Sequence, residues 1–175
     1  MNGDGTKRFY GRYRGTVANN VDPKQLGRLL VAVPDVLGDE SCIWAEPATP
    51  LVGTNMGFSY VPDQNTGVWV EFQQGDPNYA VWTGGWRGST SDLPDAANAA
   101  PPTNPPIVVQ TRTQNQLIIS SSPGEGITLQ TSATANGPQI VITSTSIKLS
   151  TGQGATVELT GNTVKINGTS LTVVG

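Results

Sequence analysis

The chain has 175 residues, a net charge of −3 and scattered basic residues, which argues against nucleic-acid binding because binders of nucleic acid concentrate positive charge on one patch. Histidine is absent, which removes the commonest general base and metal ligand, and we expect no cofactor. No apolar run approaches a bilayer span, and residues 1–11 contain no signal-peptide core. We therefore expect a protein made and assembled in the cytoplasm, with its single cysteine, Cys42, as a small buried thiol.

Aromatic residues divide the sequence into two parts. All 11 of them fall between Phe9 and Trp86, and the last 89 residues contain none. The first part therefore has the bulky side chains of a globular core, whereas residues 107–175 offer small aliphatic side chains among many Ser, Thr and Gly residues. We expect the second part to need partner chains to bury its apolar side chains.

After a flexible N-terminus at residues 1–7, the first part is expected to form five short strands. They are rich in β-branched and aromatic residues and are separated by turn signals: residues 9–19, 27–34, 42–48, 67–73 and 79–86. Helical periodicity is not sustained, and the only short helical possibility is the turn from Asp22 to Leu26, where Asp-Pro can start either a helix or a turn. Five such strands predict a small closed barrel of the OB type over residues 8–88.

Residues 89–106 lack apolar periodicity and are rich in proline and small residues. The pairs Pro101–Pro102 and Pro105–Pro106 favour an extended backbone, because proline fixes its own φ and restricts the preceding residue. We therefore expect a Pro-rich linker that holds the two parts of the chain at a set spacing.

Pairs of apolar residues separated by one residue recur throughout residues 107–175. The pairs are Ile107/Val109, Leu117/Ile119, Ile127/Leu129, Ile140/Ile142, Ile147/Leu149, Val157/Leu159, Val164/Ile166 and Leu171/Val173. The last three pairs follow each other at intervals of seven residues, and so do Gly161, Gly168 and Gly175. A coiled coil also repeats every seven residues, but residues two apart share one side of a strand and not of a helix. The repeat therefore predicts short strands separated by turns.

A single-chain β-solenoid would stack such strands, but it needs a wide apolar interior, and each strand here offers two inward residues. The pattern fits better a narrow prism in which three chains wind about one axis and each supplies a strand to each face in turn. We therefore predict an all-β fold, with the five-stranded barrel followed by an intertwined trimeric β-helix, or β-prism, at residues 107–175. Its expected trimer core is Ile140, Ile142, Ile147, Leu149, Val157, Leu159, Val164, Ile166, Leu171 and Val173.

Several motifs in the first part follow one another in a recognisable order. They are the Asp22-Pro23 turn, the Gly27-Arg28 strand start, the Trp-x-x-Pro segment at Trp44, the Val-x-Val-x-Phe strand at 68–72 and the Gly75-Asp76-Pro77 turn. Over residues 8–88 this order closely resembles the gp-V/VgrG-like baseplate spike family of contractile-tailed phages, type VI secretion systems and extracellular contractile injection systems. The β-prism resembles the same family in architecture.

This resemblance implies a structural central spike whose barrel docks to the tube and hub and whose homotrimeric β-helix touches the target membrane only during injection. Related spikes carry a small conical PAAR-repeat protein at the tip. We expect three copies of Leu171, Thr172, Val173, Val174 and Gly175 to form its docking platform, bound by strand addition and apolar contact. The expected location is a virion or a phage tail-like particle.

The sequence departs from this family in three ways. Glu46 stands near Trp44, where many relatives carry a basic residue, so the charge of the partner surface is expected to differ. No lysozyme-like insertion separates the barrel from the prism, so the resemblance implies no cell-wall-degrading activity. The iron that some relatives bind through histidines at the apex cannot form here, because the chain has no histidine.

Two alternative functions follow from other features of the sequence. A trimeric receptor-binding tail fibre also uses an intertwined β-prism, although in such fibres a recognition domain follows the prism instead of preceding it. An enzyme would need paired acids, and Asp35, Asp39 and Glu40 lie close together in one expected loop. Acids in a loop are usually solvated, so we expect no catalysis.

A third alternative is that the barrel binds single-stranded nucleic acid, as many OB folds do. Tyr10, Arg12, Tyr13 and Arg14 interleave aromatic and basic side chains, which can stack on bases and pair with phosphates. The same alternation is expected of a half-buried strand with Tyr and Arg on opposite faces. We expect no nucleic-acid partner, because the fold alone does not imply this function.

Overall fold

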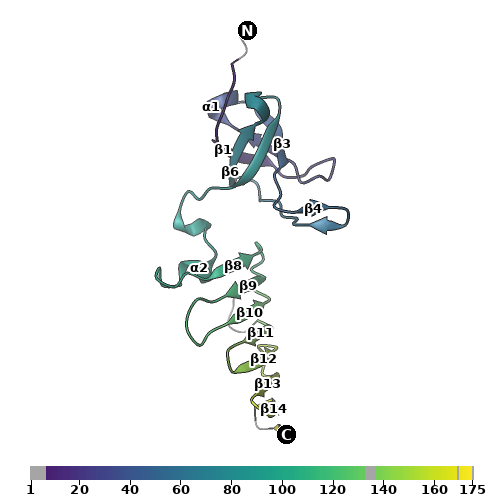
Figure 1. Ribbon diagram of the computed structural model, residues 1–175, viewed down its shortest axis with the longest axis vertical. Helices are drawn as coiled ribbons and strands as arrows, with labels where there is room; N and C mark the ends of the chain where they lie inside the picture. The colour runs from purple at the N-terminus through teal and green to yellow at the C-terminus, as the bar shows by residue number, and fades with distance from the viewer. Residues whose placement is uncertain (1–6, 133–136, 169, 175) are drawn as a thin grey trace. The chain divides into compact units, whose positions relative to one another are not determined.

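The computed structural model describes residues 7–132, 137–168 and 170–174 (Figure 1). The side chains of residues 172–174 are outside that description. The chain divides into two compact units, Met1–Gly88 and Ser89–Gly175.

The first unit contains a closed five-stranded barrel with the strand order β1-β2-β3-β7-β6 (Figure 1). Its strands are β1 (Tyr13–Asn19), β2 (Leu29–Ala32), β3 (Cys42–Pro47), β6 (Gly67–Phe72) and β7 (Ala80–Gly85). Strands β3 and β7 run parallel, and the other neighbours pair antiparallel. The predicted five-stranded barrel is therefore confirmed, with each strand inside the range expected from the sequence.

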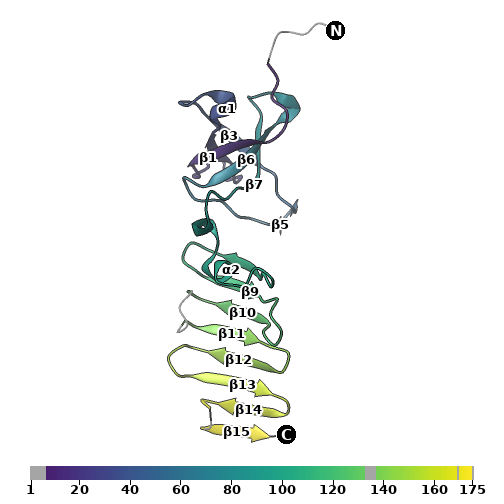
Figure 2. The ribbon, with the colours of Figure 1, turned by 90° about the vertical axis from the view of Figure 1, so that its left-hand side faces the viewer.

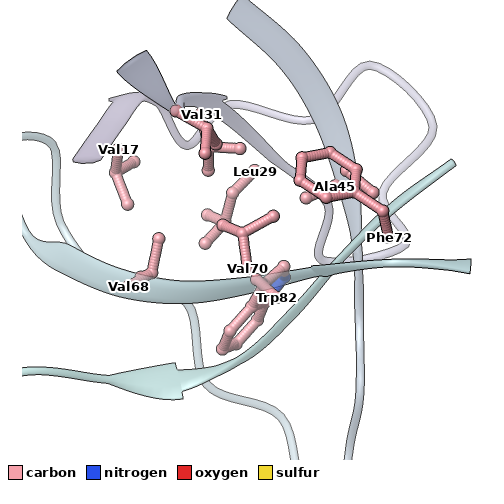
Figure 3. Close-up of a cluster of buried hydrophobic side chains, with 10 residues drawn as sticks. Val17, Leu29, Val31, Ala45, Val68, Val70, Phe72 and Trp82 are labelled. Carbon is pink, nitrogen blue, oxygen red and sulfur yellow. The ribbon is translucent and has the colours of Figure 1, made fainter. Parts of the chain in front are cut away.

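The barrel closes around an apolar core because its strands alternate inward and outward residues. In β6, for example, Val68, Val70 and Phe72 are buried, whereas Trp69 and Glu71 between them are not. The full set of buried apolar side chains is Val17, Leu29, Val31, Val33, Ala45, Val68, Val70, Phe72, Ala80 and Trp82. Figure 3 shows side chains from this set gathered between the strands.

Cys42 does not have the burial expected from the sequence, because its side chain is exposed. It begins β3, where Ala45 is the buried position. Residues that differ by an odd number of positions lie on opposite faces of a strand, so Cys42 points outward together with Trp44 and Glu46. The prediction of a buried thiol was therefore wrong, since it relied on the residue type and not on the phase of the strand.

Short helices occur at positions that the sequence analysis missed. They are α1 (Pro34–Leu37), η1 (Gln73–Gly75), η2 (Thr90–Asp92) and α2 (Asp95–Asn98). Pro34 stands at the start of α1, where its fixed φ suits a first helical turn. Residues 22–26, where the sequence left a short helix or a turn open, form turns and bends.

Asp22 organises that turn with its carboxylate, which accepts hydrogen bonds from the backbone N–H groups of Lys24, Leu26 and Arg28. The Arg28 side chain donates to the same carboxylate through Nε at 3.0 Å and Nη2 at 2.7 Å. The Arg28 guanidinium also lies 5.1 Å from the centroid of the Trp44 ring. The backbone N–H groups of this turn therefore bond to a side chain and not to the carbonyl groups of a helix, which favours a turn over a helix here. The bond from Arg28 holds the pKa of Asp22 well below its usual range.

We expect Asp22→Asn to lower the melting temperature of the barrel and to flatten its dependence on pH in acid. A depressed carboxyl pKa stabilises the fold fully above the unfolded value of about 4, and this contribution is lost as the pH falls toward the folded value. Thermal unfolding of both proteins at pH 7 and pH 3 measures the difference. Asp35→Asn, which changes an exposed acid of α1, is the control and should resemble the wild-type protein at both pH values. If the wild-type protein and Asp22→Asn lost the same amount of stability between pH 7 and pH 3, the role of this carboxylate would be contradicted.

The second unit is an eight-stranded antiparallel sheet in which the strands follow one another in chain order (Figure 2). They are β8 (Ile107–Gln110), β9 (Gln116–Ile119), β10 (Ile127–Gln130), β11 (Gln139–Ile142), β12 (Ser146–Ser150), β13 (Thr156–Thr160), β14 (Thr163–Ile166) and β15 (Leu171–Val174). Every apolar pair identified in the sequence falls in one of these strands. The predicted all-β class is confirmed.

Consecutive strands of one chain pair directly with each other, which differs from the expectation that each strand belongs to a different face of a prism. The turn between β13 and β14 is too short for such a crossing, because Gly161 and Asn162 alone join these two strands. Gly161 has a φ of +57°, which a tight hairpin turn of this length requires. One chain therefore forms one continuous sheet, and the intertwined β-helix stays a prediction about the trimer.

Residues 89–106 were expected to be extended throughout. The segment instead contains the short helices η2 and α2. Ser89 and Asp92 form a capping box around η2, and Pro94 precedes α2. Alanine has the highest helix propensity, and Ala96 and Ala97 lie within α2, before the proline pairs at 101–102 and 105–106. The prediction of an extended backbone was therefore wrong for the first half of this segment, because it relied on proline pairs that lie in the second half.

Candidate trimerisation interface

The strand register places the apolar pairs of neighbouring strands opposite one another, so the apolar residues form two columns at positions on one face of the C-terminal sheet. The first column is Ile107, Ile119, Ile127, Ile142, Ile147, Leu159, Val164 and Val173. The second is Val109, Leu117, Leu129, Ile140, Leu149, Val157, Ile166 and Leu171. We call these sixteen positions the apolar face.

The apolar face is uncovered in a single chain. Ile140 is 37% exposed, Ile147 is 41% exposed and Leu149 is 42% exposed. Among the described residues, every buried apolar side chain belongs to the barrel, so the sheet has no core of its own. A contiguous apolar surface of this kind marks an interaction site on a protein.

The opposite face of the sheet is suited to solvent over its C-terminal strands. Lys148, Glu158 and Lys165 lie directly opposite one another on β12, β13 and β14. Opposite charges in this position stabilise an antiparallel sheet by roughly 0.2–1 kcal/mol per pair. The two faces therefore differ in chemistry, and the apolar face is the one that needs a partner.

The expected trimer-core residues all lie in the two columns of the apolar face. They therefore share one face of the sheet, as the spacing of the apolar pairs predicted. Their contact with a second copy stays a prediction. Of the five residues expected to dock a tip protein, Leu171 is 52% exposed at the start of β15. The side chains of Thr172, Val173 and Val174, and the whole of Gly175, are outside the described residues.

Arg12, Tyr13 and Arg14, at the start of β1, each make a side-chain contact within the barrel. Arg12 forms a 2.8 Å ion pair with Glu71, and the Arg14 guanidinium lies 4.9 Å from the centroid of the Trp86 ring. Tyr13 packs with Phe72 at a centroid distance of 5.7 Å. Tyr13 therefore faces inward and Arg12 and Arg14 face outward, as expected of a half-buried strand, whereas Tyr10 is 72% exposed.

Trp86 packs flat on the barrel because of a glycine in the neighbouring strand. Its indole Nε1 donates to the Gly15 carbonyl at 3.2 Å, and a Cβ at Gly67 would overlap its ring. Any side chain at position 67 would therefore displace Trp86 and the Arg14 guanidinium that rests on it.

The acids considered as a catalytic pair do not form a cleft. Asp35, Asp39 and Glu40 are all exposed, on α1 and the loop after it. Within the described parts of the chain, no group of three His, Cys, Asp or Glu residues could hold a metal ion. Over the same residues, no helix is both long and apolar enough to cross a bilayer.

Sequence reasoning missed an apolar surface on the barrel. The short strands β4 (Val52–Gly53) and β5 (Met56–Gly57) form a hairpin between β3 and β6. Around it, apolar side chains are exposed at Leu51, Val52, Met56, Phe58, Tyr60 and Val61. The Tyr60 ring meets the Trp82 ring edge to face at 5.4 Å, which connects this hairpin segment to the core. The signal available in the sequence was a group of apolar residues outside any predicted strand.

Two family models match the chain, one for each unit. Residues 13–86 match the type VI secretion system and phage-baseplate injector OB domain, and residues 106–172 match the phage baseplate V C-terminal trimerisation domain. A comparison with curated proteins finds no significant match. Both models describe structural baseplate domains, and the second one supports a homotrimer. The chain belongs to the gp-V/VgrG-like baseplate spike family of contractile phage tails and type VI secretion systems.

Proposed function

We propose that this protein is the homotrimeric central spike of a contractile injection machine, linking the tube and hub to a tip that pierces a target membrane. The observation that carries the proposal is the apolar face, which is uncovered in one chain and lies within a trimerisation domain that follows a baseplate OB domain. Three copies related by a threefold axis would each turn this face inward and supply one another with the missing core.

The sheet suits a part that transmits force. Each strand from β8 to β15 is hydrogen-bonded to the next, so the stack has no unpaired strand in its interior. Hydrogen bonds in such a continuous array support one another, and the apolar core adds contacts between the chains. The contracting sheath would push this stack forward, and the spike would touch the membrane only during that stroke.

The barrel is proposed to dock the spike to the tube and hub. Its exposed hairpin around β4 and β5 is the surface best suited to that contact, because Val52 and Phe58 are 79% and 63% exposed. Exposed apolar side chains gathered on one projecting hairpin are a common anchor for a partner protein.

The tip is proposed to bind at β15. This strand is at one edge of the sheet and pairs with β14 on its other side. An edge strand offers unpaired backbone groups, and Leu171 adds an exposed apolar side chain. A separate tip protein of the PAAR type would cover three such edges by strand addition.

We expect particles purified from a producing strain to contain three copies of this chain together with tube, hub and tip proteins. A chain that lacks residues 171–175 should enter the particle through its barrel but lose the tip protein, which mass spectrometry of the particles would detect. Absence of the full-length chain from the particles would contradict the spike function. Retention of the tip on the truncated chain would contradict only the docking site, and the absence of any PAAR-type protein would favour a blunt spike.

A further inference from the structure

The C-terminal sheet has two flanks, which are the rows of turns where its strands end (Figure 2). The turns after β8, β10, β12 and β14 form one flank, and the turns after β9, β11 and β13 form the other. A groove with a volume of about 770 Å³ runs along the first flank, from the start of β9 to the end of β14. Among the residues that the structure describes, none from the second flank lines it. We call the first the groove flank and the second the open flank.

The floor of the groove is the second column of the apolar face. Five residues of this column line it: Leu129, Ile140, Leu149, Val157 and Ile166. Turn residues such as Thr151 and Ala155 line it at the groove flank. Its exposed surface is almost wholly apolar, so the groove opens on the apolar face and not on the opposite face of Lys148. The groove therefore continues the surface that a trimerisation domain has to bury.

The groove is large enough for a row of aliphatic side chains. A cavity of roughly 150 Å³ holds a molecule of the size of benzene, so the groove has room for about five such groups. The first column of the apolar face supplies one side chain per strand over the same stretch from β9 to β14: Ile119, Ile127, Ile142, Ile147, Leu159 and Val164. The chain thus carries an apolar row that matches the groove in length and in size.

We propose that the groove of one chain is filled by the open flank of the next chain, so that the first column of each chain packs on the second column of its neighbour. The inference rests on the homotrimer of the proposed function. A closed ring of three chains needs two different surfaces on each chain, whereas contact between two identical surfaces joins chains in pairs. The two flanks of this sheet are two such surfaces, because turns border a groove on one flank only.

This contact gives the trimer three equivalent corners and one sense of rotation about its axis. Each sheet would form one wall of a prism, and each corner would join a groove flank to an open flank. The first column would then lose the solvent contact that it has in a single chain, where Ile147 and Leu159 are both 41% exposed. A row of aliphatic side chains that leaves water on association is a favourable contribution to the trimer.

Cysteine cross-linking of the full-length protein tests which flanks meet. In a Cys42→Ser background, Ala155→Cys places a thiol on the groove flank and Asn162→Cys places one on the open flank. Within one chain these positions lie beyond opposite ends of β13, whose five residues span roughly 17 Å, too far for a disulfide. We expect oxidation of the double variant to join all three chains. Denaturing, non-reducing electrophoresis should then show a band of three times the chain mass.

Each single-cysteine variant should stay at the mass of one chain, because the three copies of one flank lie at separate corners. A second pair combines Ala155→Cys with Thr145→Cys in the turn after β11, the next turn along the open flank. A short bismaleimide is applied to both pairs, since it joins neighbouring thiols that do not meet disulfide geometry. The control pair is Lys148→Cys with Asn162→Cys, in which the first thiol lies exposed on the opposite face of the sheet and should link no chains.

Three results would overturn the proposal. Linked pairs of chains from Ala155→Cys alone would show that groove flanks meet each other. Absence of linked chains in both test pairs, while light scattering of the same samples still finds trimers, would show that no neighbouring open flank fills the groove. Either result leaves the homotrimer of the proposed function intact. A monomeric Cys42→Ser parent in light scattering would contradict that homotrimer itself, and this inference with it.

Discussion

Ile140→Glu is expected to convert the trimer to a monomer while the barrel stays folded. Ile140 lies in the middle of the apolar face, opposite Leu129 and Leu149. In one chain it is already 37% exposed, so a glutamate is tolerated there, but three carboxylates brought together in a dry interface would each lose several kcal/mol of hydration. Light scattering should change from three times the 18.3 kDa chain mass to a single chain. Ile147→Glu and Val164→Glu are expected to act in the same way.

The control for this variant is the next residue along the strand. Val141 points to the opposite face and is a direct neighbour of the exposed Lys148, so Val141→Glu places its charge beside a lysine and away from the apolar face. It should remain trimeric. All four tryptophans lie in the barrel unit, so their fluorescence reports barrel folding separately from association. If Ile140→Glu stays trimeric, or if both variants dissociate alike, the inward assignment of the apolar face is wrong.

Trp82→Ala is expected to unfold or severely weaken the barrel while the C-terminal sheet keeps the chains together. The Trp82 side chain is 1% exposed, and its Nε1 donates to the Gly27 carbonyl at 3.2 Å. Truncating a buried tryptophan leaves a cavity and an unpaired carbonyl, which costs about 3–5 kcal/mol. That is a large share of the stability of a small domain. Urea unfolding followed by the fluorescence of the remaining tryptophans measures the loss.

Trp44→Ala provides the comparison, because Trp44 lies on the outer face of β3 under Arg28 and is only half-buried. Its removal should cost much less than the removal of Trp82. Light scattering should find both variants trimeric, since neither residue belongs to the C-terminal unit. Dissociation of Trp82→Ala would indicate that the barrel holds the trimer together, contrary to the role assigned to the apolar face.

Local patterns were enough to predict every strand of the two sheets. The barrel strands were recognised by β-branched and aromatic runs between turn signals, and β8–β15 by apolar residues two positions apart. Strand periodicity also predicted which side chains share a face, because side-chain direction in a strand depends on residue parity alone. Ile140 and Ile142 illustrate this, since both lie on the apolar face as expected.

Features that depend on a distant contact escaped this reasoning. Cys42 was expected to be buried because of its residue type, but the barrel closes on the other face of β3. The sequence left a helix or a turn open at Asp22, and the turn forms because the Asp22 carboxylate accepts hydrogen bonds from N–H groups and a guanidinium as far along the chain as Arg28. Periodicity also did not reveal which strand pairs with which, and in the structure each strand of the C-terminal sheet pairs with its neighbour in the same chain.

By itself the sequence determined an all-β chain with an aromatic barrel first and an apolar-paired sheet second, because propensity, parity and turn chemistry are local properties. Only the tertiary structure decided that the eight strands form a single sheet whose apolar face stays uncovered, since burial depends on what other segments pack nearby. The burial of Gln116 belongs to the same category. Gln116 looks like an ordinary polar strand end in the sequence, and it becomes a buried, half-paired amide only when strands and turns far apart in the chain come together around it.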